Sequence, residues 1–346
     1  MTSNAYTPNA EGINKTFWPA IDPVRVALAI VIVILHTNYL YVPQGYLAVE
    51  IFFIISGFLI ASRKQSTSGV FPRFITTISS IYPAYLASII LTAVILPLKL
   101  NDFIIAISLL QAIGLNDNVI NTPTWFLTCY LWAGLLYSFL RASLSDRNLY
   151  ATSMLIAIIG YTCLFALTPA HGLNYTIETT IGFLPPSIVR ALAGIGLGVG
   201  LYAAYQHIPR LRVRKSIATL IELFVIASCF YIAFRRPISV EMDTSFLPLG
   251  FLLIYLLAAE QGLISKFCGF LGQKYKFWRN ISFDLFIFHF PLLLFTNKIA
   301  GYSPTGIIET FCTILALCLG SIALGFIVRA AKPAIHRLIT LQPSPA

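Results

Sequence analysis

The chain is divided into a series of apolar runs, most of them long enough to cross a lipid bilayer. Apolar residues make up 58% of its 346 residues and charged residues only 10%, whereas about 25% of an ordinary soluble domain is charged. A spanning helix needs roughly 20 apolar residues. The pattern predicts an all-α polytopic protein of the lipid bilayer, without a sizeable soluble domain. The candidate runs are residues 23–41, 45–62, 75–97, 102–115, 124–141, 149–168, 187–205, 217–234, 245–260, 281–298 and 306–329.

The basic residues between these runs predict their orientation, because cytoplasmic loops carry an excess of Lys and Arg. Run 102–115 is short for a span. If it stays on the outer side as a re-entrant or interfacial helix, the Lys- and Arg-rich loops all face the cytoplasm. We therefore predict about ten transmembrane helices with both termini cytoplasmic. The expected divisions are a tail at 1–20, a transmembrane domain at 21–332 and a tail at 333–346.

Composition also argues against some classes of protein. The net charge of +10 does not indicate nucleic-acid binding, because the Lys and Arg residues lie in short loops between apolar runs. The six cysteines are scattered in or beside apolar runs and include no Cys-x-x-Cys pair. Neither a metal site nor a disulfide framework is therefore predicted.

Four glycines recur at every second position in the run 187–205, at 194, 196, 198 and 200. Small residues in a spanning helix allow a neighbouring helix to approach closely. No strand precedes these glycines, as a phosphate-binding loop would require. We therefore expect them to form a helix-packing surface.

Three ionisable side chains lie within the first two runs, where each costs about 3 kcal/mol to insert. Arg25 and His36 are eleven residues apart, which places them within about 20° on one helix face and about 16 Å apart along the axis. Glu50 lies about five residues into the second run, at a depth similar to that of His36. A carboxylate beside an imidazole fixes its tautomer and suits general-base catalysis. We interpret the set as functional; the alternative is a buried polar pair that only ties two helices together.

The residues around this set form a recognisable signature. After the segment from Arg25 to His36 comes Gly45-Tyr-Leu-Ala-Val-Glu50-Ile-Phe-Phe-Ile-Ile-Ser56-Gly57-Phe58. This combination resembles the start of the acyltransferase 3 family of membrane acyltransferases, which has an Arg and a His at this spacing and then Gly-x-x-x-Val-acidic-x-Phe-Phe-x-x-Ser-Gly-Phe. The resemblance is specific over about residues 20–90. Further similarities are Ile81-Tyr82-Pro83-Ala84-Tyr85 to the family's third helix and, more weakly, Trp125-Phe126-Leu127 and residues 281–291.

The resemblance implies transfer of an acyl group, usually acetyl, from a cytoplasmic acyl-CoA to an acceptor at the outer face. Acceptors in the family are often sugar hydroxyls of cell-envelope glycans. The expected partners are therefore acetyl-CoA or another acyl-CoA as donor substrate and a carbohydrate or lipid-linked glycan as acceptor, with no metal. The expected location is the inner (cell) membrane, as a multi-pass protein. Arg25 and His36 match the family's functional pair, and Glu50 its acidic position.

The chain departs from the family on the third helix. The family commonly has Arg-x-x-Arg just before the Tyr-Pro pair, where Thr77 and Ser80 stand here. Arg73 lies seven residues before Ser80, two turns down the same helix face. We expect Arg73 to supply the missing charge from nearer the cytoplasm.

These residues predict a mechanism. His36 is expected to deprotonate the acceptor hydroxyl with Glu50 orienting it, and an acyl-histidine intermediate is the alternative route. Arginine is suited to hold phosphates, so the nucleotide end of the donor is expected to bind four basic residues at the cytoplasmic ends of the first three spans. These are Arg25, Arg63, Lys64 and Arg73.

Four other polar or aromatic residues have two interpretations each. Ser56 is a candidate for hydrogen bonding to the thioester, or with Gly57 serves helix packing. Trp125 is an interfacial anchor or a stacking platform for a sugar. His289 contacts the acceptor or is structural. Arg190 snorkels to the lipid headgroups or meets an anionic acceptor.

Two other classes of function fit parts of this pattern. A transporter or flippase for a lipid-linked or small substrate would also have about ten helices and buried charges. Such proteins often contain internal repeats and paired broken helices, which this sequence does not show. A structural or assembly subunit without chemistry would not need the costly buried set of Arg25, His36 and Glu50. The sequence therefore favours the enzyme.

Overall fold

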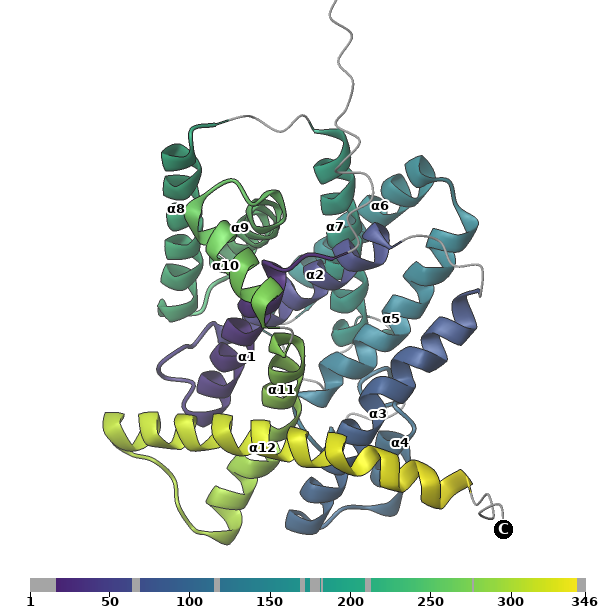
Figure 1. Ribbon diagram of the computed structural model, residues 1–346, viewed down its shortest axis with the longest axis vertical. Coiled ribbons are helices and arrows are strands. Elements are labelled where there is room, and N and C mark those ends of the chain that lie inside the picture. The colour runs from purple at the N-terminus through teal and green to yellow at the C-terminus, as the bar shows by residue number, and fades with distance from the viewer. Residues whose placement is uncertain are drawn as a thin grey trace, which may run out of the picture.

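The computed structural model describes residues 17–63, 69–114, 119–168, 172–174, 181, 183–208, 213–275 and 277–340, with side chains described up to residue 331. Within these residues the regular secondary structure is helical, apart from one isolated β-bridge between Ile181 and Leu184. The helices are α1 (Ile21–Thr37), η1 (Gly45–Leu47), α2 (Ala48–Ser62), α3 (Val70–Ile95), α4 (Leu100–Ile107), α5 (Thr124–Ser143), α6 (Asp146–Leu167), α7 (Pro186–His207), α8 (Lys215–Phe234), α9 (Val240–Ala259), α10 (Leu263–Lys274), α11 (Trp278–Leu294), the π-helical turn η2 (Phe295–Ile299) and α12 (Ile307–Thr340) (Figure 1).

Several helices begin where the sequence offers a capping group for the unpaired N–H groups of the first turn. Ser145 accepts a hydrogen bond from the Asn148 N–H ahead of α6, and Ser239 accepts one from the Met242 N–H ahead of α9. Pro186 occupies the first position of α7, where its missing N–H costs nothing. Local chemistry therefore fixes these three helix starts.

Seven helices in the described part of the chain are long and apolar enough to cross a membrane: α2 with η1, α3, α6, α7, α8, α9 and α12 up to Ala331. Helices α1 and α11 have 17 residues each, at the short end of the range for a span. These observations confirm the all-α membrane architecture. The count of ten spans and the cytoplasmic position of both termini stay predictions.

The core is built around α2 and α7 (Figure 1). Of the apolar stretch in each, 83% and 72% is buried, against 22% in α3, α8 and α12. A Cβ added to Gly57 on α2 would collide with the Ile195 carbonyl, and one on Gly198 would collide with the Ile54 carbonyl. On the other face of α7, a Cβ on Gly196 would lie 2.6 Å from the Ser153 carbonyl of α6. The predicted packing role of the α7 glycines is therefore confirmed.

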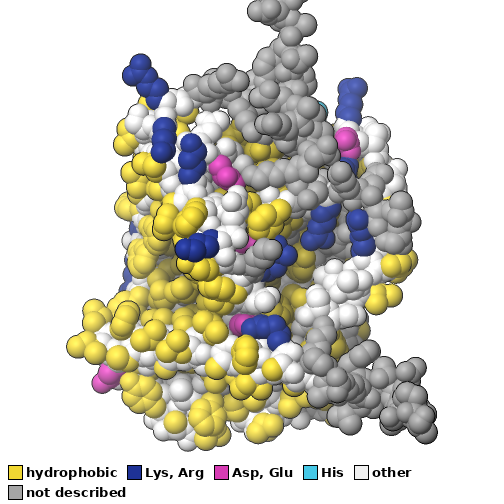
Figure 2. Space-filling view, in the orientation of Figure 1, with side chains coloured by type: hydrophobic (Ala, Val, Ile, Leu, Met, Phe, Trp, Pro, Cys, Tyr) yellow, Lys and Arg dark blue, Asp and Glu magenta, His cyan; other side chains and the backbone are white. Residues whose placement is uncertain are grey.

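The outer helices present apolar side chains outward. Along α12, 74% of Ile308, 68% of Phe311 and 61% of Leu319 is exposed. Figure 2 shows hydrophobic side chains over the visible part of α12 and most Lys and Arg side chains toward the upper part of the molecule. A continuous apolar surface of this kind fits a protein surrounded by lipid tails.

Two short helices bear on the topology predicted from the sequence: α4 agrees with it and α10 was not expected. Helix α4 has eight residues, so it is about 12 Å long and too short to cross a bilayer. This agrees with the expectation that run 102–115 does not span. Helix α10 was not expected, because 261–280 carries several basic residues and was interpreted as a loop. It forms because the Glu222 carboxylate accepts hydrogen bonds from the N–H groups of Gly262 and Ile264 at its start.

The non-spanning assignment of α4 predicts that Lys99 and Asn118, which lies outside the described residues, are on the same side of the membrane. Single cysteines at these two positions, in a cysteine-free background, should react equally with a membrane-impermeant maleimide added from outside. A cysteine at the exposed Lys215, predicted to be cytoplasmic, should react only after permeabilisation. Reaction of the Asn118 position only after permeabilisation would contradict the ten-span topology.

Candidate active site

His36 and His289 face each other where α1 packs against α11. His36 lies in the last turn of α1, which ends because Asn38 takes an extended conformation. Its Nδ1 is 2.9 Å from Nε2 of His289, and the two rings stack with centroids 5.1 Å apart. His289 is fully buried, and its Nδ1 lies 2.7 Å from the Leu285 carbonyl oxygen. His36 is only half-buried. Part of its side chain therefore stays accessible, although its imidazole partner is buried.

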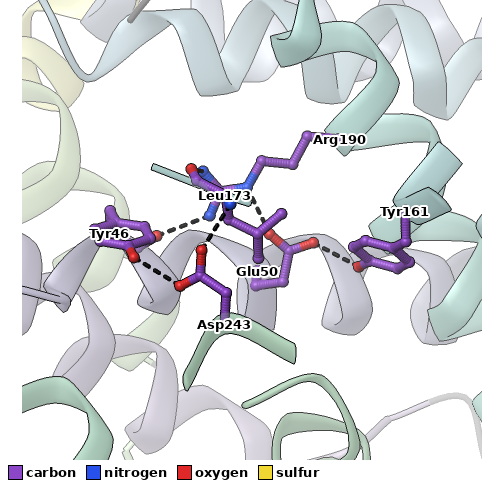
Figure 3. A network of polar contacts seen from close by, with 6 residues as sticks. All are labelled: Tyr46, Glu50, Tyr161, Leu173, Arg190 and Asp243. Carbon is purple, nitrogen blue, oxygen red and sulfur yellow. Dashed lines mark hydrogen bonds and ion pairs between the residues drawn. The ribbon is translucent and has the colours of Figure 1, made fainter. Parts of the chain in front are cut away.

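Glu50 does not orient His36 in this structure, contrary to the expectation from depth. One carboxylate oxygen accepts a hydrogen bond from the Tyr161 hydroxyl at 2.5 Å, and the other accepts one from Nε of Arg190 at 2.6 Å. Glu50 and Arg190 are both almost completely buried. The reason is the close contact of α2 with α7, which brings a guanidinium to the carboxylate (Figure 3).

Arg190 belongs to a larger buried network (Figure 3). Its Nη atoms donate hydrogen bonds to the carbonyls of Tyr46 and Leu173 at 2.9 and 3.2 Å. The Tyr46 hydroxyl and the Leu173 N–H in turn donate to the two carboxylate oxygens of Asp243, at 2.6 and 2.7 Å. The network thus joins η1, α2, α6, α7, α9 and the segment 172–174. Arg190 therefore neither snorkels to headgroups nor faces solvent, since only 2% of it is exposed.

A cavity of about 190 Å³ lies between the end of α2, the start of α3 and the end of α5. Three arginines line it, one from each region: Arg63, Arg73 and Arg141. Thr77, at a position where the family has an arginine, also lines it. The structure thus brings two of the four expected donor-binding residues together and adds Arg141 near the end of α5.

The other two expected donor-binding residues are not part of this lining. Lys64 lies outside the described residues. Arg25 is paired with Asp22 at 3.7 Å, and Arg279 approaches the same carboxylate at 3.6 Å. Tyr130 also lines the cavity.

Ser56 and Trp125 have contacts that bear on their two interpretations. The Ser56 hydroxyl donates to the Phe52 carbonyl of its own helix at 2.7 Å, and the neighbouring Gly57 allows the close approach of α7. Trp125, at the start of α5, is half-buried and lies with its ring 5.9 Å from the Arg190 guanidinium carbon. Trp125 is therefore packed beside the buried network.

The comparison with protein families decides the class of this protein. The model of the acyltransferase 3 family, described as an acyltransferase domain, matches residues 18–330. The chain belongs to the acyltransferase 3 family. The resemblance seen in the first three helices therefore extends over nearly the whole of this membrane acyltransferase. The comparisons with curated proteins and with solved structures find no match.

Sequence reasoning about this acyltransferase missed the partners of its buried carboxylates. Tyr161 and Asp243 were not singled out, and the two interpretations of Arg190, snorkelling to the headgroups or meeting an anionic acceptor, did not include a buried pair with Glu50. A signal was available, because Arg190 and Asp243 are charged residues at the starts of apolar runs, and unpaired charges there are costly. The sequence alone could not say which two helices would bring them together.

Proposed function

We propose that this acyltransferase moves an acyl group, with acetyl the first candidate, from cytoplasmic acyl-CoA to a hydroxyl of a carbohydrate or lipid-linked glycan at the outer face of the inner membrane. The observation that carries the proposal is the separation of two features. His36 is in the last turn of α1, which is followed along the chain by the start of α2. The three-arginine cavity lies instead where α2 and α5 end and α3 begins. In an acyl-CoA the phosphates and the thioester are likewise separated, by the pantetheine arm.

The donor site is built on charge. Arg63, Arg73 and Arg141 would hold the phosphates of the nucleotide, because guanidinium groups bind phosphate oxygens with charge-assisted hydrogen bonds. Lys64 adjoins them in the sequence. Arg25 would hold the donor further along its path. Ser56, about 10 Å from Arg63 along α2, would turn its hydroxyl away from the Phe52 carbonyl to donate a hydrogen bond to the thioester carbonyl.

The chemistry is acyl transfer with His36 as general base. His36 removes the proton from the acceptor hydroxyl while that oxygen attacks the thioester carbonyl. The carbon–oxygen bond forms and the carbon–sulfur bond breaks. The leaving thiolate of coenzyme A then takes the proton from the imidazolium, so that charge and protons balance. Trp125, at the start of α5, would offer its ring to the acceptor sugar.

The proposal is tested with the purified protein in lipid nanodiscs and acetyl-CoA. Release of the free thiol of coenzyme A measures cleavage of the thioester, and radiolabelled acetyl groups report transfer to a lipid-linked glycan fraction. We expect both signals from the wild type. A protein that binds acetyl-CoA but releases no thiol, with or without the glycan fraction, would contradict the proposed reaction.

Donor binding gives a separate prediction. Arg73→Ala and Arg141→Ala should each weaken acetyl-CoA binding about tenfold or more, because a hydrogen bond to a charged group contributes roughly 1.5–3 kcal/mol. Calorimetry in detergent measures this change. Lys266→Ala is the matched control, because it removes an exposed charge from the same predicted side without lining the cavity.

A donor fragment makes this test specific for phosphate recognition. Acetyl-pantetheine has the thioester but no phosphate, so its binding should be weak and equal in the wild type and in both arginine variants. Equal acetyl-CoA affinity in the wild type and the Arg73 and Arg141 variants would show that the phosphates bind elsewhere.

A further inference from the structure

The contact between His36 and His289 is the strongest feature that the proposed mechanism does not use. The two nitrogens are 2.9 Å apart, within hydrogen-bonding distance. We propose that His289 is the positioning residue of the base: it accepts a hydrogen bond from Nδ1–H of His36 and so leaves the lone pair of His36 on Nε2. This inference rests on the proposed function of His36 and gives His289 the role that the sequence had assigned to Glu50.

The argument begins with the protonation of His289. Its Nδ1 lies 2.7 Å from the Leu285 carbonyl oxygen, and a carbonyl can only accept, so the hydrogen is on Nδ1 of His289. The side chain is fully buried, and its contacts in the described part of the chain include no carboxylate. Burial of an unpaired charge is costly, so His289 is neutral. A neutral imidazole has one N–H, and Nε2 of His289 is therefore an acceptor.

The tautomer of His36 follows from that of His289. Because Nε2 of His289 accepts, Nδ1 of His36 must carry the hydrogen of the shared bond. Neutral His36 then has its lone pair on Nε2, the nitrogen that can take a proton from a hydroxyl. After proton transfer, Nδ1–H of His36 still donates to His289. An orienting partner on Nδ1 is the arrangement that serine proteases achieve with a carboxylate.

The surrounding helices hold this pair in place. The hydroxyl of Ser282, two helical turns before His289, donates to the Arg25 carbonyl at 3.1 Å. Helices α1 and α11 are therefore joined near both ends of α1. Phe290 packs edge-on against His36, with ring centroids 5.6 Å apart. These contacts limit rotation of the His36 ring and keep its Nδ1 directed at His289.

The first test uses two substitutions. His289→Leu removes the acceptor, and His289→Gln replaces it by an amide oxygen that can accept from the same N–H. The rate is measured as thiol release from acetyl-CoA. His289→Leu should lower kcat about 100-fold while the KM for acetyl-CoA changes less than about twofold, since only the base is affected. His289→Gln should recover kcat to within about tenfold of the wild type. Wild-type kcat in a folded His289→Leu protein would overturn the proposal.

The second test needs no turnover and is made on the wild type. Two-dimensional ¹⁵N–¹H spectra of protein labelled at histidine distinguish the two tautomers, and the His36→Ala spectrum identifies the His36 signal. We expect the Nδ1–H tautomer for His36 in the wild type. The Nε2–H tautomer there would overturn the inference. A wild type with the Nδ1–H tautomer but no acyl transfer would support the pair and contradict the proposed function, so the two failures are distinguishable.

Discussion

Replacing His36 by alanine should abolish acyl transfer while the protein still inserts, folds and binds acetyl-CoA. General acid–base catalysis contributes about 10²–10⁴-fold, and the substitution removes the proposed base without touching the arginine cavity. The measurements are thiol release from acetyl-CoA and acylation of the glycan acceptor in cells, with protein level checked by immunoblot. Binding of acetyl-CoA should remain within about twofold of the wild type, because the phosphate-binding residues are intact.

The matched control for this prediction is His207→Ala. His207 is an exposed histidine in the last turn of α7, and its ring packs edge-on against Tyr150. This variant should transfer acyl groups at the wild-type rate. Normal transfer by a well-expressed His36→Ala protein would show that the pair of histidines is structural, and the base would have to be sought elsewhere.

The second large effect is expected on stability, from Arg190→Leu. This substitution leaves the Glu50 carboxylate buried beside Tyr161 without its guanidinium and removes the Arg190 donor from the carbonyls of Tyr46 and Leu173. Breaking a buried ion pair by removing one partner costs about 3–5 kcal/mol. Thermal unfolding in detergent should therefore begin at a much lower temperature than for the wild type.

Two further variants test whether the charge causes this loss. The double variant Glu50→Leu, Arg190→Leu removes both charges, so its destabilisation should be smaller than the sum of the two single effects. Arg235→Leu changes an exposed arginine and should lie within about 0.5 kcal/mol of the wild type. An Arg190→Leu protein that unfolds like the wild type would contradict a stabilising role of the network.

The helices themselves could be predicted from the sequence because the determinants are local. In lipid every backbone N–H and C=O group must be paired within the chain, so a long apolar run becomes a helix wherever it is placed. The same holds for the glycines of α7, since small side chains permit close approach whatever the partner helix. Helix α10 could not be foreseen, because its start depends on Glu222 from another helix.

The position of each polar group on its own helix was also within reach of the sequence. Helical geometry gives the shared face of Arg25 and His36, and the order of the apolar runs gives the approximate depth of Glu50. Depth and face say nothing about which neighbouring helix a side chain will meet, and the expected contact of Glu50 with His36 rested on depth alone.

Only the tertiary structure decided those partners. Glu50 meets Arg190, 140 residues away in the chain, and His36 meets His289, 253 residues away. Two helices that are close in sequence, α1 and α2, thus direct their ionisable groups toward different neighbours, α11 and α7. The physical reason is that helix packing is set by the summed contacts of whole faces, here the glycines of α7 against α2, and a single polar residue takes whatever partner that packing provides. The sequence therefore determined a helical membrane acyltransferase with a histidine and arginines at set positions along its helices, and the packing of distant helices determined which of these groups contact one another.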